Sequence, residues 1–330
     1  MDNRKAKSLV IKAGRELVHS NLIARTWGNV SVRIDRETFA ITPSGRNYMT
    51  LTEDDIVVVR IKDLSYEGEI KPSSEKRLHR EIYKNREDVS FIIHTHQQNG
   101  SAVAAMPLNG FEPEGEYPNL GKKVLCSRYA LPGTKKFSKN VVAALNKSQG
   151  NAILLRYHGV VCFGSSYGQV FETAKSLEEA CEKYLAGISP PLMEAGEERR
   201  EAGEREGEIW NRDPVVMSFL DLETDLFPFS EDFAQMIGWK APYLHSPEED
   251  RGEAAVLIPG KGALCRGVSR SDAEAVAMLV TKNCKAFFAA GAMGRPKPIS
   301  RPDVMIMRMV YLKKYEKRKG GDHGATGDRL

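Results

Sequence analysis

Three histidines carry the pattern in this chain that is best suited to chemistry. His94 and His96 stand two residues apart in FIIHTHQ, a run that predicts a buried strand. Residues i and i+2 of a strand point to the same side, so both imidazoles can reach one metal ion. His158 interrupts a second apolar run, and we expect Gly159 to permit a tight turn that aims the ring inward. Three imidazoles with one open position are typical of a catalytic zinc site.

Glu75 is the carboxylate expected beside these histidines. It follows Ser73 and Ser74 at the predicted start of a helix, where either serine can serve as the cap. A helix N-terminus stabilises anions, so hydroxyl groups there can also hold a phosphate. Alone, Glu75 is an ordinary first-turn acid, and an HxH pair is as typical of structural histidines. His79 lies one turn further along, and we predict a packed helix histidine rather than a ligand.

Polar turns in the first 75 residues predict an anion pocket. GNVS spans 28–31 and TPSG spans 42–45, and each places a glycine beside hydrogen-bonding side chains. Glycine lets the backbone approach an oxyanion closely. Each motif alone is ordinary turn chemistry. Together with the serines before Glu75, they make a phosphate site a reasonable expectation.

Composition places the chain among ordinary globular proteins. Of its 330 residues, 41% are hydrophobic and 28% are charged. The formal charge of +4 is too small to indicate a nucleic-acid partner, and no run of about 18 apolar residues predicts a membrane span. The first ten residues lack a signal-peptide core, so we expect a cytoplasmic protein. The five cysteines form no CxxC pair, which favours buried, reduced thiols over disulfides.

Alternating strand and helix patterns over residues 1–188 predict an α/β domain. We expect a charged linker at 189–213 and a flexible tail at 319–330. Between them, 214–318 is predicted to contain a degenerate partial repeat. A shift of 103 residues lays Ala152–Gly187 over Ala255–Ala290 without a gap and aligns two pairs of cysteines. Lys261 then faces His158, so the second copy is expected to hold no metal.

The ordered motifs TWGNVS, ITPSG, KPSSE, LHREIY, IIHTH and RYHGVV together resemble the class II aldolase/adducin family over roughly residues 5–188. The resemblance implies a three-layer α/β fold with a central, mostly antiparallel sheet flanked by helices. It also implies homo-oligomers, commonly tetramers, with active sites at subunit interfaces.

The resemblance also implies roles for particular residues. The implied metal is zinc, although cobalt, manganese or iron would suit the same ligands. Its ligands would be Glu75, His94, His96 and His158. The implied phosphate-binding residues are Gly28, Asn29, Ser44, Gly45, Ser73 and Ser74.

The activity implied is metal-dependent cleavage of a small ketose 1-phosphate to dihydroxyacetone phosphate and an aldehyde, with Glu75 moving protons. A sugar-phosphate 4-epimerase or a decarboxylase on the same scaffold is an alternative, although the epimerase branch usually has Asp in place of Glu75. A non-catalytic scaffold like adducin is disfavoured because all three histidines are present. Tyr117 and Tyr129 are both candidates for the general acid, and the sequence does not choose between them. It does not identify the aldehyde either.

Overall fold

The computed structural model describes residues 1–322 except 21, 24–26, 189–199, 204 and 295, and the side chains of 247 and 314–322 are likewise not described. The chain divides into two compact units. The first comprises Met1–Met193 and Ala289–Gly294, and the second comprises Glu194–Phe288 and Arg295–Leu330.

An eight-stranded sheet forms the centre of the first unit. Its order is β3-β2-β1-β4-β8-β7-β6-β5. Neighbouring strands are antiparallel except β6 and β7, which are parallel. The mostly antiparallel sheet expected from the sequence is therefore confirmed. The strands are β1 (Gly28–Arg33), β2 (Thr38–Ile41), β3 (Val57–Arg60), β4 (Phe91–Thr95), β5 (Gly110–Phe111), β6 (Val124–Ser127), β7 (Ala152–Leu155) and β8 (Gly159–Gly164).

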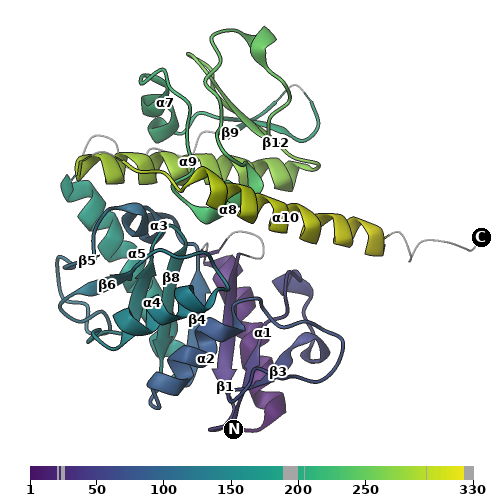
Figure 1. Ribbon diagram of the computed structural model, residues 1–330, viewed down its shortest axis with the longest axis vertical. Helices are drawn as coiled ribbons and strands as arrows, with labels where there is room; N and C mark the ends of the chain where they lie inside the picture. Colours follow the sequence, from purple (N-terminus) through teal and green to yellow (C-terminus); the bar gives the residue numbers. More distant parts are fainter. Residues whose placement is uncertain (21, 24–26, 189–199, 204, 295, 323–330) are drawn as a thin grey trace, which may run out of the picture. The chain divides into compact units, whose positions relative to one another are not determined.

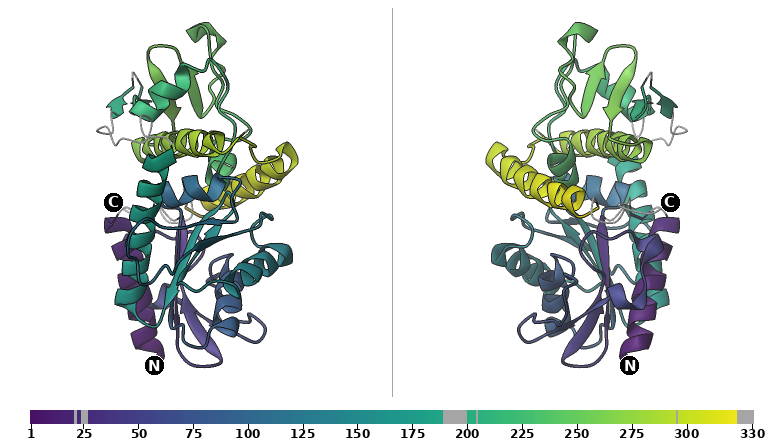
Figure 2. Two further views of the ribbon diagram at one scale, coloured as in Figure 1. Left: turned by 90° about the vertical axis from the view of Figure 1, so that its left-hand side faces the viewer. Right: turned by 90° about the vertical axis from the view of Figure 1, so that its right-hand side faces the viewer.

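Helices cover both faces of this sheet, which confirms the three-layer arrangement. Helices α1 (Asn3–His19) and α5 (Tyr167–Ile188) lie on one face, and α2 (Lys76–Asn85) and α4 (Lys135–Leu145) lie on the other (Figures 1 and 2). Helix α3 (Gln98–Ala105) packs against α5. Two short 3-10 helices, η1 (Tyr48–Thr50) and η2 (Glu53–Asp55), precede β3.

The central strands β4 and β8 are buried along their whole length. Both faces of these strands are covered by helices, so their sequences are continuous apolar runs rather than alternating ones. The face toward α2 and α4 forms a large apolar core that includes Phe39, Leu78, Ile82, Phe137 and Val161. A histidine at the end of β4 is thus held by a rigid, fully packed layer.

The second unit contains a four-stranded antiparallel sheet with the order β11-β12-β10-β9. Its strands are β9 (Arg200–Ala202), β10 (Glu208–Asn211), β11 (Ala255–Ile258) and β12 (Gly262–Arg266). Its other elements are α7 (Pro214–Leu220), α8 (Glu231–Met236), η3 (Pro247–Glu249), α9 (Arg270–Ala292) and α10 (Arg301–Asp322).

Two boundaries expected from the sequence need correction. The segment 189–213 is not a linker throughout, because β9 and β10 within it belong to the second sheet. Its dense charge hid two short strands, one of which places Ile209 in the interior. The tail predicted from 319 begins later, since α10 continues to Asp322. Residues 189–199 and 323–330 lie outside the described residues.

The second unit repeats the element pattern of part of the first. Strand β7 pairs with β8 in the register Ala152↔Cys162, and β11 pairs with β12 in the equivalent register Ala255↔Cys265. A long helix follows in both places. Strand β10 also pairs with β12 as β4 pairs with β8. The order β9-β10-β12-β11 therefore parallels β1-β4-β8-β7, which supports an internal repeat wider than the sequence match.

The repeat replaces the histidines at two matched positions. His94 pairs with Val161, and Trp210 pairs with Leu264 at the same place in the second sheet. The amide of His158 donates to the carbonyl of Leu155, as the amide of Lys261 donates to that of Ile258. A protonated lysine offers only donors and cannot ligate a cation. These positions support the expectation that the second unit carries no metal site of this kind.

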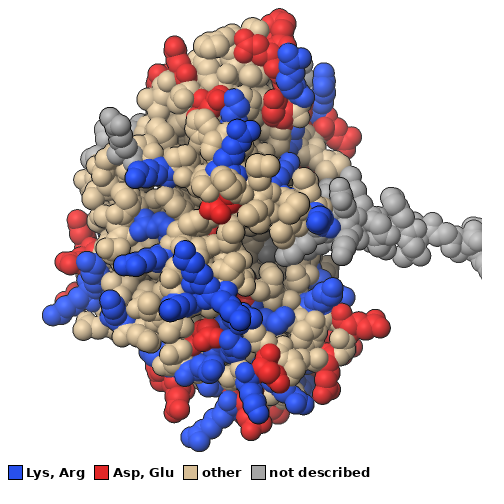
Figure 3. Space-filling model, viewed as in Figure 1, with Lys and Arg blue, Asp and Glu red and all other residues tan. Residues whose placement is uncertain are grey.

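Other features concern the whole chain. All five cysteines are free and buried, as the sequence predicted. Among the helices of the described residues, none is both long and apolar enough to cross a membrane. On the face viewed in Figure 3, basic side chains are mixed with acidic ones. A small positive excess favours encounter with anions in general rather than with one partner class.

Candidate metal centre

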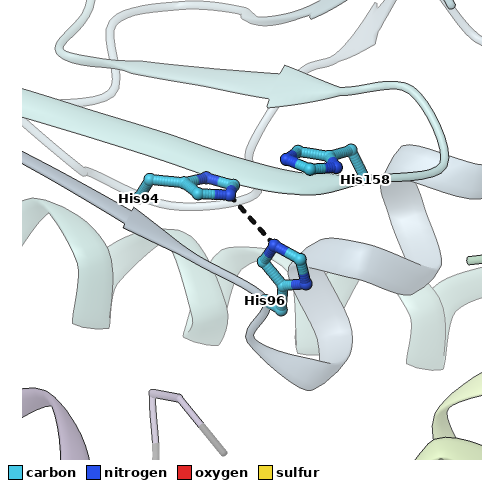
Figure 4. Close-up of side chains that lie close together, drawn as sticks. All are labelled: His94, His96 and His158. Atoms are coloured by element: carbon cyan, nitrogen blue, oxygen red, sulfur yellow. Dashed lines mark hydrogen bonds between the residues drawn. The ribbon is translucent and has the colours of Figure 1, made fainter. Parts of the chain in front are cut away.

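Three imidazoles converge at the end of β4 and the turn before β8. His94 lies in β4, His96 follows that strand, and His158 precedes β8 (Figure 4). One ring nitrogen of each lies within 4.8 Å of the other two. The Nε2 atoms of His94 and His96 are 2.9 Å apart, and the His94 and His158 rings are stacked. This cluster is the metal-type group of three or more side chains found in the described part of the chain.

A backbone carbonyl fixes the tautomer of His94. Nδ1 of His94 lies 2.7 Å from the carbonyl oxygen of Val160, so Nδ1 carries the proton and donates it. Nε2 then presents its lone pair to the other two rings. Burial lowers the pKa of His94 to about 3, against the opposing effect of Glu75. A neutral imidazole oriented by a hydrogen bond on its far nitrogen is the form that binds metals.

The carboxylate of Glu75 lies beside two of these rings. Its Oε1 is 2.7 Å from Nε2 of His158, and its Oε2 is 3.3 Å from Nε2 of His94. The side-chain amide of Asn29 donates to Oε2 at 2.6 Å. Burial opposes ionisation of Glu75, but the histidines outweigh it and hold the pKa of this carboxyl well below its usual value. Glu75 is therefore an ionised acceptor.

These four side chains fit a divalent metal ion. A tetrahedral zinc with bonds of about 2.0–2.1 Å requires ligand atoms about 3.3 Å apart. The spacings of 2.9 Å and 3.3 Å at His94 are close to that value. Imidazole nitrogens with one carboxylate suit zinc and several other first-row metals. His94, His96, His158 and Glu75 would hold such an ion.

Backbone pairing places the two serine turns side by side. The amide of Ser44 donates to the carbonyl of Lys71, and the amide of Ser73 donates to that of Thr42. The predicted serine cap is wrong: Glu75 itself is the N-cap of α2, without a side-chain cap bond. Ser73 Oγ instead accepts from the Glu75 amide at 3.2 Å. The turns that hold Ser44, Gly45, Ser73 and Ser74 thus adjoin the carboxylate.

Gly28 is required where β1 meets β4. Its φ is +136°, and a Cβ there would lie 2.6 Å from the carbonyl oxygen of His94. Any side chain at this position would push the strand that carries His94. Gly28 therefore has a packing reason that is independent of any ligand, and its neighbour Asn29 is placed opposite His94 in the sheet.

The turn before β8 differs from expectation. Gly159 does not adopt a left-handed backbone; Tyr157 does, with φ +60°. Gly159 is required for another reason, because a Cβ there would lie 2.4 Å from the carbonyl oxygen of Thr95. In the second unit the position matching Tyr157 is Gly260, with φ +66°. The first unit thus keeps a strained residue directly before His158.

This strain predicts an unusual order of stabilities at position 157. Tyr157→Gly and Tyr157→Ala both remove the ring, but only alanine retains the cost of a left-handed backbone, about 1–2 kcal/mol. We expect the glycine variant to be the more stable by about 1 kcal/mol, opposite to the usual preference for alanine. Denaturant unfolding of the two variants measures the difference. A more stable alanine variant would contradict the strain.

The two candidate tyrosines lie in different surroundings. The hydroxyl of Tyr117 donates to Glu179 and accepts from Lys183, both on α5. The ring of Tyr129 packs edge-on against Tyr157 with centroids 5.5 Å apart. The structure therefore associates Tyr129, rather than Tyr117, with the turn that carries His158.

His79 is buried and lies outside the metal cluster, in line with its predicted place in the helix. It is more than a packed side chain, however. Its Nδ1 lies 2.6 Å from Ser31 Oγ, and its Nε2 is hydrogen-bonded to Oδ1 of Asn29. Burial lowers the pKa of His79 to about 4, so the ring is neutral. The sequence held a signal for this network, because Glu75, His79 and Tyr83 recur every four residues on one helix face.

This combination of a mostly antiparallel sheet between two helical layers and a three-histidine, one-glutamate cluster defines a class. A model of the Class II Aldolase and Adducin N-terminal domain matches residues 8–185, and the chain belongs to this family.

Individual relatives are similar over most of their own length. A 5-deoxy-D-ribulose 1-phosphate aldolase of Bacillus thuringiensis serovar kurstaki is 29% identical, over 62% of this chain and 97% of its own. An L-fuculose phosphate aldolase of Escherichia coli K12 is 31% identical, over 57% of this chain and 86% of its own. A solved L-fuculose 1-phosphate aldolase matches 57% of this chain and 88% of its own with TM-score 0.52 and 33% identity.

Proposed function

We propose that this protein is a metal-dependent aldolase that cleaves a small ketose 1-phosphate to dihydroxyacetone phosphate and an aldehyde. The observation that carries the proposal is the convergence of His94, His96 and His158 on the Glu75 carboxylate. Relatives similar to the first unit are named as ketose-phosphate aldolases, which supports the reaction class. Zinc is the proposed metal, because three imidazoles and a carboxylate suit it.

Retro-aldol cleavage requires two proton movements. A proton leaves the hydroxyl on the carbon that becomes the aldehyde, the adjacent C–C bond breaks, and a proton is returned to the ketose fragment. A divalent metal in the histidine cluster would supply Lewis acidity for the charge that develops on the ketose oxygens. Glu75 is ionised and hydrogen-bonded, so its carboxylate can accept and return the proton.

The polar turns are proposed to bind the phosphate. They offer the amide of Asn29, the hydroxyls of Ser44, Ser73 and Ser74, and backbone N–H groups beside Gly28 and Gly45. Pairing between 42–44 and 71–73 brings two of these turns together, and Ser73 is in contact with Glu75. A phosphate held there would lie within reach of the reacting carbons of a small ketose.

Products distinguish the proposal from its rivals. An aldolase releases two carbonyl fragments, an epimerase returns one isomer, a decarboxylase releases carbon dioxide, and an adducin-like scaffold leaves the sugar unchanged. The test is incubation of the metal-loaded protein with a set of phosphorylated ketoses, followed by assay for dihydroxyacetone phosphate. Release of that product is expected with at least one ketose. A single isomer as product would instead establish the epimerase.

Loss of the Asn29 amide is expected to discriminate between substrates. Asn29→Ala should weaken a phosphorylated ketose about tenfold or more, since hydrogen bonds to charged groups contribute about 1.5–3 kcal/mol. The unphosphorylated analogue should lose much less. The ratio of kcat/KM for the two compounds in wild type and variant measures this. Equal losses for both compounds would remove the phosphate assignment.

A homo-oligomer, commonly a tetramer in this family, remains part of the proposal. The aldehyde end of the substrate would then be contacted by loops and by a neighbouring subunit. Sedimentation of the purified chain tests this, and a monomer active at every concentration would contradict it.

A further inference from the structure

We infer that His79 is a positioning residue that holds the side-chain amide of Asn29 as a donor toward the Glu75 site. The inference deepens the proposed function, because it concerns how that site presents itself to an anionic substrate. It rests on a buried hydrogen-bonded chain from the carboxylate into the protein interior. The chain runs through Glu75, Asn29, His79, Ser31 and Tyr83.

The contacts in this chain are short, and its inner members are buried. Nδ2 of Asn29 is 2.6 Å from Glu75 Oε2, and Oδ1 of the same amide is hydrogen-bonded to Nε2 of His79. Ser31 Oγ is 2.6 Å from Nδ1 of His79 and 2.8 Å from the hydroxyl of Tyr83. Asn29, Ser31, His79 and Tyr83 are all at most 3% exposed. No water competes at that depth, so each group must find its partner within the chain.

The charge of Glu75 sets the direction of every proton in the chain. An ionised carboxylate only accepts, so the Asn29 atom facing it must be the NH2 group. Oδ1 of Asn29 then faces His79 and needs a donor, which places the ring proton of His79 on Nε2. Nδ1 of His79 accepts from the hydroxyl of Ser31. Ser31 in turn accepts from the hydroxyl of Tyr83.

The reverse direction is less favourable at both ends. It requires Tyr83 to donate to the carbonyl of Ser90, which is 3.5 Å away rather than 2.8 Å. It also puts a bare Nε2 of His79 against Oδ1 of Asn29, or, if the amide turns over, Oδ1 against the Glu75 carboxylate. Two acceptors facing each other in a buried site are costly. His79 therefore locks one of the two amide orientations.

The consequence is an asparagine that shows donors only. One N–H of Asn29 is used by Glu75. The second N–H is left for a ligand, and a phosphate oxygen is the acceptor that the proposed function supplies. Asn29 also stands opposite His94 in the sheet, so the locked amide lies at the edge of the metal cluster.

A double-mutant cycle with inorganic phosphate as the probe tests this role. The variants are His79→Leu, His79→Gln, Asn29→Ala and the double variant Asn29→Ala/His79→Leu, each loaded with metal and titrated by calorimetry. His79→Leu should weaken phosphate about tenfold, the effect of one hydrogen bond to a charged group. His79→Gln keeps a donor near the Nε2 position and should stay within about threefold. In the Asn29→Ala background, His79→Leu should add less than about twofold.

A control separates positioning from general destabilisation. Phe39 packs against Tyr83 with ring centroids 5.3 Å apart, and it is fully buried. Phe39→Leu should lower the unfolding midpoint as much as His79→Leu or more, without changing phosphate affinity. An undiminished tenfold effect of His79→Leu in the Asn29→Ala background would show that His79 acts by packing. That result overturns the inference.

The tautomer of His79 gives a readout that does not depend on phosphate. A long-range 1H–15N spectrum of the histidine-labelled, zinc-loaded protein, assigned by the signal missing from His79→Gln, should show the proton on Nε2 and a bare Nδ1. A ring protonated on Nδ1 contradicts the inference whatever the phosphate affinity. If wild type bound no phosphate while His79 kept the expected tautomer, the phosphate assignment would fail and the locked orientation of Asn29 would stand.

Discussion

Replacing Glu75 with glutamine is expected to lower turnover by about 10²–10⁴-fold, the usual effect of removing a general base. Glutamine keeps the size of the side chain and its place at the start of α2, but it has no basic carboxylate. The hydrogen bond from Asn29 can persist, because the glutamine carbonyl also accepts. Steady-state cleavage rates of wild type and Glu75→Gln measure the loss.

Metal content is the control for this variant. Three imidazoles remain in Glu75→Gln, so about one metal per chain should be retained after dialysis. Low turnover with metal retained assigns proton transfer to Glu75. Full activity would remove the catalytic role. Loss of both activity and metal would assign Glu75 to ligation instead.

Loss of His158 is expected to have the second large effect. His158→Ala removes one of three converging imidazoles and leaves the Glu75 carboxylate without its 2.7 Å partner. Bound zinc should fall from about one per chain to near zero after dialysis, because two imidazoles rarely hold a transition metal tightly. Elemental analysis of the dialysed protein measures this.

An exposed histidine supplies the matched control. His245 lies at the surface of the second unit, outside the metal cluster. His245→Ala should keep full occupancy. Full occupancy in His158→Ala as well would show that His158 is not a ligand, and the proposed cluster would need another member.

The metal-type residues could be predicted from the sequence because their geometry is local. His94 and His96 share one face of a strand, which a spacing of two guarantees. Glu75 stands at a helix start, and His158 stands at a break between two apolar runs, so both were recognisable. The structure brings all four together, although their closest sequence neighbours are 19 residues apart at Glu75 and 62 residues apart at His158.

The roles of individual turn residues were harder to predict, because they depend on tertiary contacts. Gly159 was expected to supply a left-handed turn, yet its lack of a side chain serves the close approach of Thr95. Tyr157 adopts the left-handed conformation that glycine would prefer. Nothing local distinguishes these two cases, since both need the neighbouring strand to be in place.

His79 shows a different limit. Its apolar neighbours on α2 favoured a packed histidine, and burial confirms that part of the prediction. Its polar partners lie on β1, which is distant in sequence. Two polar ladders meet there: Asn29 and Ser31 two apart on a strand, and Glu75, His79 and Tyr83 four apart on a helix. Either ladder was visible in the sequence, but their facing each other was not.

Charge also misled the prediction of organisation. The segment 189–213 is dense in charged residues, which is typical of a linker, but 200–211 contributes two strands to a sheet. Short edge strands with exposed, charged side chains carry too little periodicity to be recognised. By contrast, the shift of 103 residues predicted a strand, strand and helix at 255–290 that match in bounds and register.

Metal dependence of the cleavage products tests the central proposal most directly. The protein is stripped with a chelator, divided, and restored with zinc or with magnesium, and each portion is given the ketose 1-phosphate found active in the screen. We expect dihydroxyacetone phosphate and an aldehyde in equal amounts from the zinc portion and at least 10²-fold less from the stripped protein. Equal cleavage by stripped and zinc-restored protein would contradict a metal-dependent aldolase.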